Sequence, residues 1–588
     1  MSEAVAHRGP DDAGLWAEGP AILAQRRFIT TRAGRRQPIA ANPFVLVMDG
    51  TIYETGALAL ELERAGGQPR TGGDADHVLA AWQVWRSDTV ARLMGDFALA
   101  VWNRQDRVLT LARDPVGVRP MYYAAKDGKF AFASDVRALL LLPWVSRGLA
   151  TEDLAEYLSF RYTHAPRTLL RDVRLLPAGH IARADATGVR LHRYWSPNWA
   201  APSVDEPSED EQQRQLDNVL QRAVDRRLPV DAPVGVLLSG GTASSAILRA
   251  VARRRPPRTF NVSFADGGLD EASFAGRVAK LYDAEHTTVR VSREDFAEAL
   301  PSVVEVLGQP LPSPAAVLQY LVAKEARSEV RVLLSGDGAD ELLGGPAVAS
   351  LARPLRASRV VGRMPDGLRS SLMQASGGRL GNPTAFGLSQ LVGGSQVFDA
   401  DARMEVLRDA ALVRPGMRQT MLSPLYNEVD TDSVNEMLHV YLRGWLPEDS
   451  LLRSDRTSMA AGVEVRFPLL DADVVSYVTG LPGRAKIKRR RGRWHGKWPL
   501  KRILEAELPA RLVWRPKRGL PSPLDRWLRD SGEAFLWEHI ESVCEDPQGL
   551  FRKDAIRRLA RKHAAGDANH GAQLWALFFF DRWFRTLS

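Results

Sequence analysis

Cysteine is almost missing from this sequence: Cys544 is the single one among 588 residues. One thiol cannot form an internal disulfide or a cysteine-based metal cluster. Its acidic neighbours Glu541 and Glu545 disfavour the thiolate form that catalysis requires. We therefore interpret Cys544 as a structural or incidental residue.

Long apolar segments are also missing. No stretch approaches the roughly 18 uninterrupted apolar residues of a membrane-spanning helix, and residues 1–13 lack the apolar core of a signal peptide. Hydrophobic residues make up 45% of the chain and charged residues 25%, which is usual for a globular protein. These observations predict a cytoplasmic protein without a membrane partner.

Acidic residues are fewer than basic ones. The chain has 79 Lys and Arg against 70 Asp and Glu, a net charge of +9 that suits anionic ligands such as ATP. The densest basic run is KIKRRRGR (486–493), followed by Lys497, Lys501 and Arg502. It indicates either a solvated face or the neighbourhood of a phosphate. No helix-turn-helix, zinc finger or aromatic RNA motif accompanies it, so we predict no nucleic-acid partner.

The length predicts roughly two to four domains. Runs such as FVLVMDG, FALAVWN, RVLTLARD and KFAFASD predict a sheet-rich domain over about residues 14–195, with helices near 57–65 and 75–85. The Pro-, Ser- and acid-rich segment 196–213 predicts a linker and the start of a helix. Beyond it, VGVLL, TFNVSF, HTTVRV and VRVLLS alternate with helical segments, which indicates a parallel sheet with crossover helices. After about residue 350 the pattern is helical, and GAQLWALFFFDRWFRTL predicts a buried final helix.

The segment VGVLLSGGTASSA (234–246) predicts a buried strand that runs through a Gly/Ser turn into a helix. The glycines let backbone N–H groups close on an anion, and the helix directs its positive end toward it. Ser239, Ser244 and Ser245 add hydroxyl donors. No Lys-Ser/Thr follows the glycines, so this is not a Walker A loop. The pattern predicts a phosphate site of another kind.

This turn resembles the pyrophosphate loop SGGxDSS of the ATP pyrophosphatases, which cleave ATP between the α and β phosphates and activate a carboxylate as its adenylate. Three further motifs resemble the asparagine synthetase family in residue pattern and spacing: LLSGDGADELLGG (333–345), LPEDSLLRSDRTSMAAGVEVRFPLLD (446–471) and RPKRGLPSPLDRWLR (515–529). HRGPDDAG, MDGTIYE, LARDPVGVRPMYY and FASDVRALL resemble the glutaminase domain of that family. The resemblance covers nearly the whole chain.

The resemblance implies an α/β protein in two parts. Residues 1–195 would form a degenerate Ntn-type glutaminase domain, an αββα β-sandwich. After the linker (196–213), residues 214–588 would form an ATP pyrophosphatase domain with a parallel sheet and a helical carboxyl-terminal part. ATP and Mg²⁺ are the implied cofactors.

Roles for single residues follow from the same resemblance. Lys517 is expected to stabilise charge on the α-phosphate and the leaving pyrophosphate. Asp340 is expected to bind Mg²⁺, and Asp337 to assist near the metal or the amine, although these acids could instead cap the next helix. The residues expected to hold the nucleotide are Leu237, Ser239, Gly240, Gly241, Ser244, Ser245, Val262, Ser335 and Gly336.

Glu464 is a further catalytic candidate. It belongs with Asp455, Arg456 and Arg466 to a motif whose apolar surroundings imply buried, paired charges. A structural network and a substrate contact are equally compatible with these four residues. The sequence does not identify the base that accepts a proton from the attacking amine.

Several departures from the family pattern bear on function. Ala243 stands where the pattern has Asp, usually a magnesium ligand. Ser2 follows Met1 and HRGPDDAG begins at His7, so the usual first strand with its nucleophilic cysteine is not found, and the glutamine-binding motif NGE appears as Asp49-Gly50-Thr51. Together these changes predict a first domain that no longer releases ammonia.

Without ammonia, the adenylate must be attacked by an amine of the substrate itself, as in β-lactam synthetases and lasso peptide cyclases. The β-lactam enzymes resemble a version with Tyr where this chain has Asp337, so we favour a lasso peptide cyclase. It would activate an Asp or Glu side chain of a linear precursor peptide and join it to the amino-terminal amine. A leader-binding protein and a leader peptidase would be its partners.

Other functions stay open: an asparagine synthetase that uses ammonia, β-lactam-like ring closure, and an ATP- or peptide-binding relative without chemistry. Ala243 is compatible with a variant compensated elsewhere, with an inactivating substitution, or with a protein that only binds.

Overall fold

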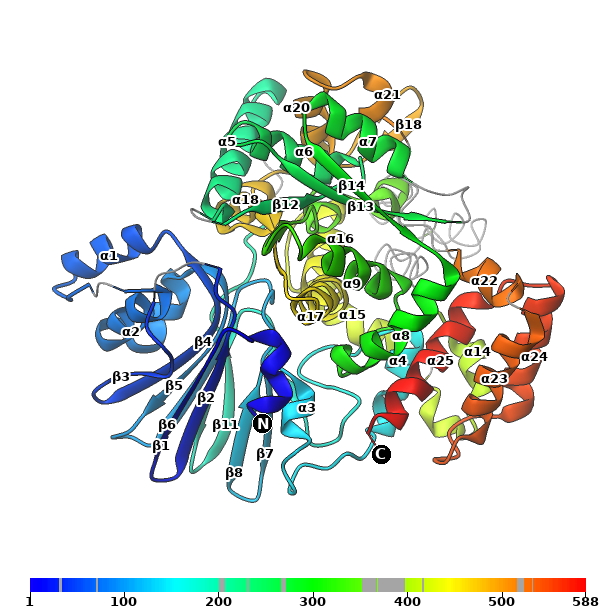
Figure 1. Ribbon diagram of the computed structural model, residues 1–588, viewed down its shortest axis with the longest axis horizontal. Coiled ribbons are helices and arrows are strands. Elements are labelled where there is room, and N and C mark those ends of the chain that lie inside the picture. The colour runs from blue at the N-terminus through cyan, green and yellow to red at the C-terminus, as the bar shows by residue number, and fades with distance from the viewer. Residues whose placement is uncertain are drawn as a thin grey trace.

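The computed structural model describes residues 1–30, 34–69, 72–199, 207–229, 232–265, 271–351, 367, 397–414, 417–515, 523–530 and 532–587. Figure 1 shows a sheet-rich amino-terminal part beside a larger part that contains a second sheet and ends in helices α22 to α25.

The amino-terminal part is built on an antiparallel sheet of six strands in the order β11-β10-β6-β5-β4-β3. The strands are β3 (Ile39–Ala41), β4 (Phe44–Tyr53), β5 (Met94–Asn103), β6 (Val108–Arg113), β10 (His180–Asp185) and β11 (Gly188–Arg193). Helices α1 (Thr55–Arg64) and α2 (Asp74–Trp85) follow β4, and apolar residues of α2 pack on the sheet. The first five residues of β4 are all buried, because α2 covers one face and a second layer covers the other. The strands and helices predicted here are confirmed.

The second layer consists of two separate pieces. One is the hairpin β1 (Asp12–Glu18) and β2 (Ala21–Arg27), and the other is β8-β7-β9, with β7 (Tyr122–Lys126), β8 (Lys129–Ala133) and β9 (Arg174–Leu175). An apolar core between the layers includes Leu23, Ala100 and Met121. Helix α3 (Val136–Leu139) follows β8 and contacts β7 and β8.

The second part contains a parallel sheet of five strands in the order β14-β13-β12-β15-β16. The strands are β12 (Val234–Leu237), β13 (Arg258–Phe264), β14 (Glu285–Val291), β15 (Val332–Leu334) and β16 (Glu464–Arg466). Crossover helices include α6 (Thr242–Ala252), α7 (Ala272–Leu281), α8 (Arg293–Leu307) and α9 (Pro314–Ala326). The predicted parallel sheet is confirmed, with β16 as a strand that the sequence analysis missed. The chain goes from β12 to β13 and β14 on one side and returns with β15 on the other, so the switch point lies between β12 and β15.

Helix α5 (Glu209–Arg227) begins inside the predicted linker. Ser208 caps it, because its hydroxyl accepts a hydrogen bond from the backbone N–H of Glu211 at 3.3 Å. The helix start predicted in the acidic end of segment 196–213 is therefore confirmed.

The rest of the described chain is mainly helical, as predicted, apart from β16 and the hairpin of β17 (Lys488–Arg490) and β18 (Arg493–His495). A π-helix spans Tyr441–Leu451. The remaining α-helices are α4 (Leu154–Phe160), α10 (Ala339–Leu343), α14 (Ala400–Val406), α15 (Met417–Asn427), α16 (Ser433–Val440), α17 (Leu452–Ala460), α18 (Ala472–Thr479), α19 (Gly483–Lys486), α20 (Trp498–Glu505), α21 (Ala510–Val513), α22 (Leu524–Asp530), α23 (Gly532–Glu545), α24 (Lys553–Ala565) and α25 (Gly571–Arg585). Helix α25 is the predicted buried final helix, since Leu577, Phe579 and Trp583 are all buried. None of the helices in the described ranges is long and apolar enough to cross a membrane.

The two parts share one large apolar core. It joins residues of α4 and β7 to the parallel sheet and to α25. The hydroxyl of Tyr157 in α4, for example, donates a hydrogen bond to the carbonyl of Ala576 at 2.7 Å. Residues before the predicted boundary at 195 thus help to bury the interior of the second part.

Candidate functional site

Two turns meet at the carboxyl ends of β12 and β15. A Cβ atom on Gly336, in the turn after β15, would lie 2.9 Å from both the Cβ of Ala243 and the backbone N of Ser244. Gly240 has a φ of +67°, and a Cβ there would lie 2.7 Å from the backbone N of Ala275. Both positions require glycine, because a side chain would collide with the neighbouring turn or with the start of α7.

Hydroxyl groups hold the first turn in shape. The Ser244 hydroxyl accepts a hydrogen bond from the backbone N–H of Ser239 at 3.2 Å, and the Ser239 hydroxyl accepts one from the N–H of Gly241 at 3.2 Å. In the second turn, Ser335 donates to Asp337 at 2.8 Å. Helix α6 begins directly after Gly241, so its positive end faces the same place. The arrangement can bind an anion.

A cavity of about 1330 Å³ opens over both turns. It exceeds the roughly 300–1,000 Å³ of a typical small-molecule pocket, so it has room for a nucleotide and a second substrate. The predicted residues that line it are Leu237, Ser239, Gly241, Ser244, Val262, Ser335, Gly336, Asp337 and Asp340.

Two predicted nucleotide residues do not line the cavity. Ser245 is buried within α6. Gly240 turns the backbone against α7. Gly240 therefore shapes the turn through its conformation, and Ser245 packs within α6; their contact with a nucleotide stays a prediction. Lys517 lies outside the described residues.

Asp340 contacts a lysine that sequence analysis placed only in a basic run. The Nζ atom of Lys497 lies 2.9 Å from Oδ1 of Asp340. No group of three or more His, Cys, Asp and Glu side chains in the described ranges could hold a metal ion. The donor set still fits Mg²⁺, since this ion is commonly bound by one or two carboxylates together with substrate phosphates, and Asp337 and Asp340 both line the cavity.

Lys497 is held in place by its backbone. It has a φ of +56° and precedes α20. Its N–H donates to the carbonyl of Leu343 at 2.8 Å. A Cβ on Gly496 would lie 1.7 Å from the carbonyl oxygen of Gly344, so only glycine fits there. The Gly-Lys pair after the basic run was the signal that could have identified this residue.

Further titratable groups surround this lysine. Burial and the nearby Lys497 lower the pKa of Lys501 to about 8. Burial, Asp340 and Asp337 raise the pKa of Glu341 well above its ordinary value. Perturbed groups of this kind gather at functional sites, and all of these side chains line the same cavity.

The RPKRG motif reaches the first turn through Arg515. Its guanidinium donates to the carbonyl of Ser239 at 3.3 Å and to Glu271 at 2.9 Å, and it lies 4.3 Å from the centre of the Phe274 ring. This motif therefore contributes at least one fixed cation beside the predicted phosphate turn.

Glu464 lies away from this cavity. Its Oε1 accepts hydrogen bonds from Arg119 at 2.9 Å and from Arg466 at 3.1 Å. Glu464 opens β16, at the amino-terminal edge of the sheet, whereas both turns lie at the opposite edge. A catalytic role in the cavity is therefore not supported for Glu464.

The motif around Glu464 forms a network between the two parts. Asp455 accepts hydrogen bonds from Arg8 at 2.6 Å and from Arg119 at 3.0 Å, and all three side chains are buried. Burial opposes ionisation of Asp455, but both arginines hold its pKa below the ordinary value. Arg456 pairs with Asp135 at 3.1 Å. Of the two alternatives for this motif, the structure supports the buried network.

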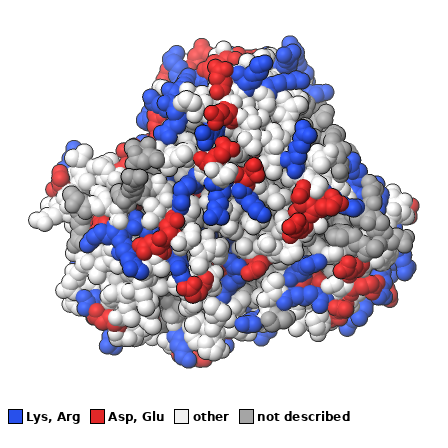
Figure 2. Space-filling view, viewed as in Figure 1, with Lys and Arg blue, Asp and Glu red and all other residues white. Residues whose placement is uncertain are grey.

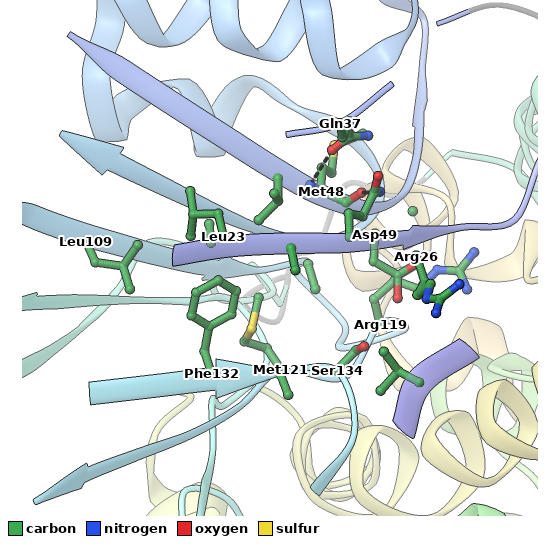
Figure 3. A pocket seen from close by; sticks show the side chains of 18 of the residues that line it. Leu23, Arg26, Gln37, Met48, Asp49, Leu109, Arg119, Met121, Phe132 and Ser134 are labelled. Carbon is green, nitrogen blue, oxygen red and sulfur yellow. Dashed lines mark hydrogen bonds between the residues drawn. The ribbon is translucent and has the colours of Figure 1, made fainter. Parts of the chain in front are cut away.

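A second cavity, of about 1320 Å³, is lined mostly by the amino-terminal part, together with residues of the second part such as Glu464 and Arg466. Figure 3 shows Leu23 and Phe132 on its two sides, with Asp49, Arg26 and Arg119 at one end. Asp49, which replaces the Asn of the glutamine-binding pattern, lies 3.0 Å from Arg8. The Asp49 carboxylate is thus engaged by an arginine of the network between the two parts.

A parallel sheet with an anion-binding turn at its switch point defines a nucleotide-binding α/β protein. The family model for asparagine synthase matches residues 215–585, and that for a glutamine amidotransferase domain matches residues 1–195. The chain belongs to the asparagine synthase family and carries an amino-terminal glutamine amidotransferase domain.

Two relatives match this chain over nearly the whole of both sequences. A Mycobacterium tuberculosis protein, named as a putative glutamine-hydrolyzing asparagine synthetase, is 34% identical, and the match covers 99% of this chain and 92% of the relative. Glutamine-hydrolyzing asparagine synthetase 1 of Bacillus subtilis is 28% identical with the same coverage. Among solved structures, a glutamine phosphoribosylpyrophosphate amidotransferase from Bacillus subtilis covers 49% of this chain and 61% of its own, at 14% identity and a TM-score of 0.24. The names of the sequence relatives favour the asparagine synthetase alternative over peptide cyclisation.

Proposed function

We propose that this chain uses ATP to activate a carboxylate as an acyl-adenylate and then joins it to an amine, with release of AMP and pyrophosphate. The observation that carries the proposal is the contact of the two turns after β12 and β15 over one cavity large enough for two substrates. Aspartate and ammonia are the first pair to test, because the relatives are named asparagine synthetases.

The chain's own groups divide the work between binding and charge stabilisation. Ser239, Ser244 and the start of α6 would hold the pyrophosphate. Lys497 would stabilise charge on the phosphates as they separate, a contribution that is often large in a desolvated site. We propose the same charge-stabilising role for Lys517. Asp337 and Asp340 would hold Mg²⁺, which supplies charge neutralisation when bound.

Free ammonia is the proposed nitrogen source. Asp49 is ion-paired with Arg8, and Thr51 replaces the acidic residue of the family motif. Neither group matches those expected to hold the amide and amine of glutamine. The amino-terminal part would then act as a scaffold through its buried network with the second part.

Peptide cyclisation is the second candidate. The size of the cavity, about 1330 Å³, is the observation in its favour, because a peptide could bind beside the nucleotide. In this case the amine would come from the amino terminus of the precursor peptide. A leader-binding protein and a leader peptidase belong to this candidate only.

The test is incubation with Mg-ATP and four substrate sets: aspartate with ammonium, aspartate with glutamine, a leader-free linear peptide, and no second substrate. AMP, pyrophosphate and the product mass are followed. We expect AMP and asparagine with ammonium. A Lys497→Met variant controls for contaminating enzymes, because it removes the cation beside Asp340.

Each other outcome identifies a different function. Peptide-dependent AMP with loss of one water from the peptide would replace the proposal by the cyclase. Release of glutamate from glutamine would show an active first part. Binding of ATP without AMP from any set, in this chain and in an Ala243→Asp variant, would show a binding protein without chemistry.

A further inference from the structure

The hairpin of β17 and β18 presents arginines to the cavity. Its strands pair so that Arg490 lies directly opposite Arg493, and Arg491 and Gly492 form the turn with φ values of +48° and +80°. Like charges directly opposite each other on paired strands are destabilising. An arrangement of this kind therefore needs anions to offset it.

Protein groups offset only part of this charge. Arg490 donates to Glu505 at 2.7 Å and lies 4.0 Å from the centre of the Trp514 ring. For Arg491 and Arg493 the described residues give no acidic partner within 4.0 Å. Both side chains are exposed and both line the cavity of the two turns. Figure 2 shows basic side chains at the upper edge of the molecule, in the region of α20, α21 and β18.

Two other cations already contact a residue of the two turns or its neighbour. Arg515 reaches the turn at Ser239, and Lys497 lies beside Asp340. The hairpin arginines precede Lys497 by a few residues and line the same cavity, so they can act on the same bound substrate as Lys497. Since Arg515 and Lys497 already lie beside the turns, the hairpin arginines are available for another anionic group of the substrate.

We infer that Arg491 and Arg493 form a subsite for a second carboxylate of the substrate, the one that is not activated. The inference rests on the proposed function and deepens it, since it makes the substrate a dicarboxylate. The second carboxylate can come from the α-carboxylate of free aspartate or from a neighbouring acidic side chain of a peptide. Guanidinium groups bind carboxylates of either source through charge-assisted hydrogen bonds.

The test measures binding and requires no turnover. Protein saturated with Mg²⁺ and α,β-methylene-ATP is titrated calorimetrically with L-aspartate, with β-alanine, which lacks the α-carboxylate, and with two peptide amides that carry two or one acidic side chains. The variant is Arg491→Gln with Arg493→Gln. The charge-matched control is Arg484→Gln with Arg489→Gln, two exposed arginines that line a neighbouring hollow instead of the cavity.

We expect the cavity variant to raise the Kd of one of the two dicarboxylate probes, aspartate or the two-acid peptide, about tenfold or more. Loss of a charge-assisted contact would have this effect. The Kd of β-alanine, of the one-acid peptide and of the ATP analogue should change less than about twofold, and the control variant should match the parent. A response of aspartate alone assigns the subsite to a free amino acid, and a response of the two-acid peptide alone assigns it to a peptide.

Three results would overturn the inference: unchanged binding of both dicarboxylates, equal weakening of β-alanine, or equal weakening of the ATP analogue. An Arg491→Lys and Arg493→Lys variant guards against a folding defect, because it keeps both charges and should recover most of the affinity. Failure of the proposed function would instead appear as absence of AMP, which this binding experiment does not measure.

Discussion

Ala243 is the residue at which the two turns touch. Its Cβ lies where a Cβ on Gly336 would be only 2.9 Å away, and it lines the cavity together with Asp337 and Asp340. A carboxylate at position 243 would therefore face these acids across the cavity. Such a group would add a ligand for Mg²⁺ but also a third negative charge beside the expected phosphates.

Ala243→Asp is expected to raise AMP formation about a hundredfold or more, the amount that one preorganised charged group commonly contributes. The increase should appear at saturating Mg²⁺ in the substrate-dependent release of AMP. Thr242→Asp, one position earlier and on the same cavity, is the matched control and should not increase the rate. No gain from Ala243→Asp would mean that the alanine is compensated elsewhere or that chemistry is lost for another reason.

Lys486 gives a prediction about pH. It is completely buried, donates to Oδ1 of Asn435 at 2.7 Å, and lies 4.5 Å from the centre of the Trp199 ring. Burial lowers its pKa from 10.5 to about 7, although Asp432 opposes the change. Between these values the unfolded chain binds more protons than the folded one, so this lysine makes the free energy of unfolding rise with pH.

Lys486→Met should therefore flatten the pH dependence of stability. Between pH 7.5 and 9 the parent should gain up to about 1.4 kcal/mol per pH unit relative to the variant. Denaturant unfolding at several pH values measures this difference. Lys488→Met, on the partly exposed hairpin, should keep the parent's slope, and parallel curves for all three proteins would contradict the assigned pKa.

At the scale of elements, short apolar runs predicted the strands next to the site. Strands β12 and β15 are almost entirely buried and have near-continuous apolar sequences, whereas β13 alternates apolar and polar residues. The strand β16 was missed because it is short and charged at both ends, and Glu464 is paired with Arg119, 345 residues away in sequence. The hairpin β17–β18 was missed because its basic residues show no apolar alternation.

Gly496 links the hairpin to the start of α20 and supports a test of this element. A Cβ there would lie 1.7 Å from the carbonyl oxygen of Gly344, so Gly496→Ala must displace the backbone that holds Lys497. We expect a loss of roughly 1–3 kcal/mol in stability and of about a hundredfold in AMP formation. Gly56→Ala, in α1 with nothing within 4 Å of the added atom, should leave both unchanged or slightly raise stability.

For the whole molecule, buried charges and a shared core join the two parts. Arg8 and Arg119 come from the amino-terminal part, and Asp455 from the second part lies between them. The apolar core also extends across the boundary that the sequence predicts. The motifs of this network are visible in the sequence, but their role is not. The choice between a structural and a substrate role depends on contacts between residues more than 300 positions apart, such as Arg119 and Asp455, which are 336 positions apart.

Asp455→Asn separates these two roles. The change leaves Arg8 and Arg119 buried without a full negative charge between them, which should cost about 3–5 kcal/mol of stability in a single unfolding transition. The proposed cavity lies at the opposite edge of the sheet, so AMP formation by the folded variant at low temperature should stay within about threefold of the parent. Glu54→Gln, which removes a half-exposed partner of Arg226 at 2.7 Å, should cost less than about 1 kcal/mol. Loss of AMP formation with unchanged stability would instead make Asp455 a substrate contact, and the network would then belong to the chemistry.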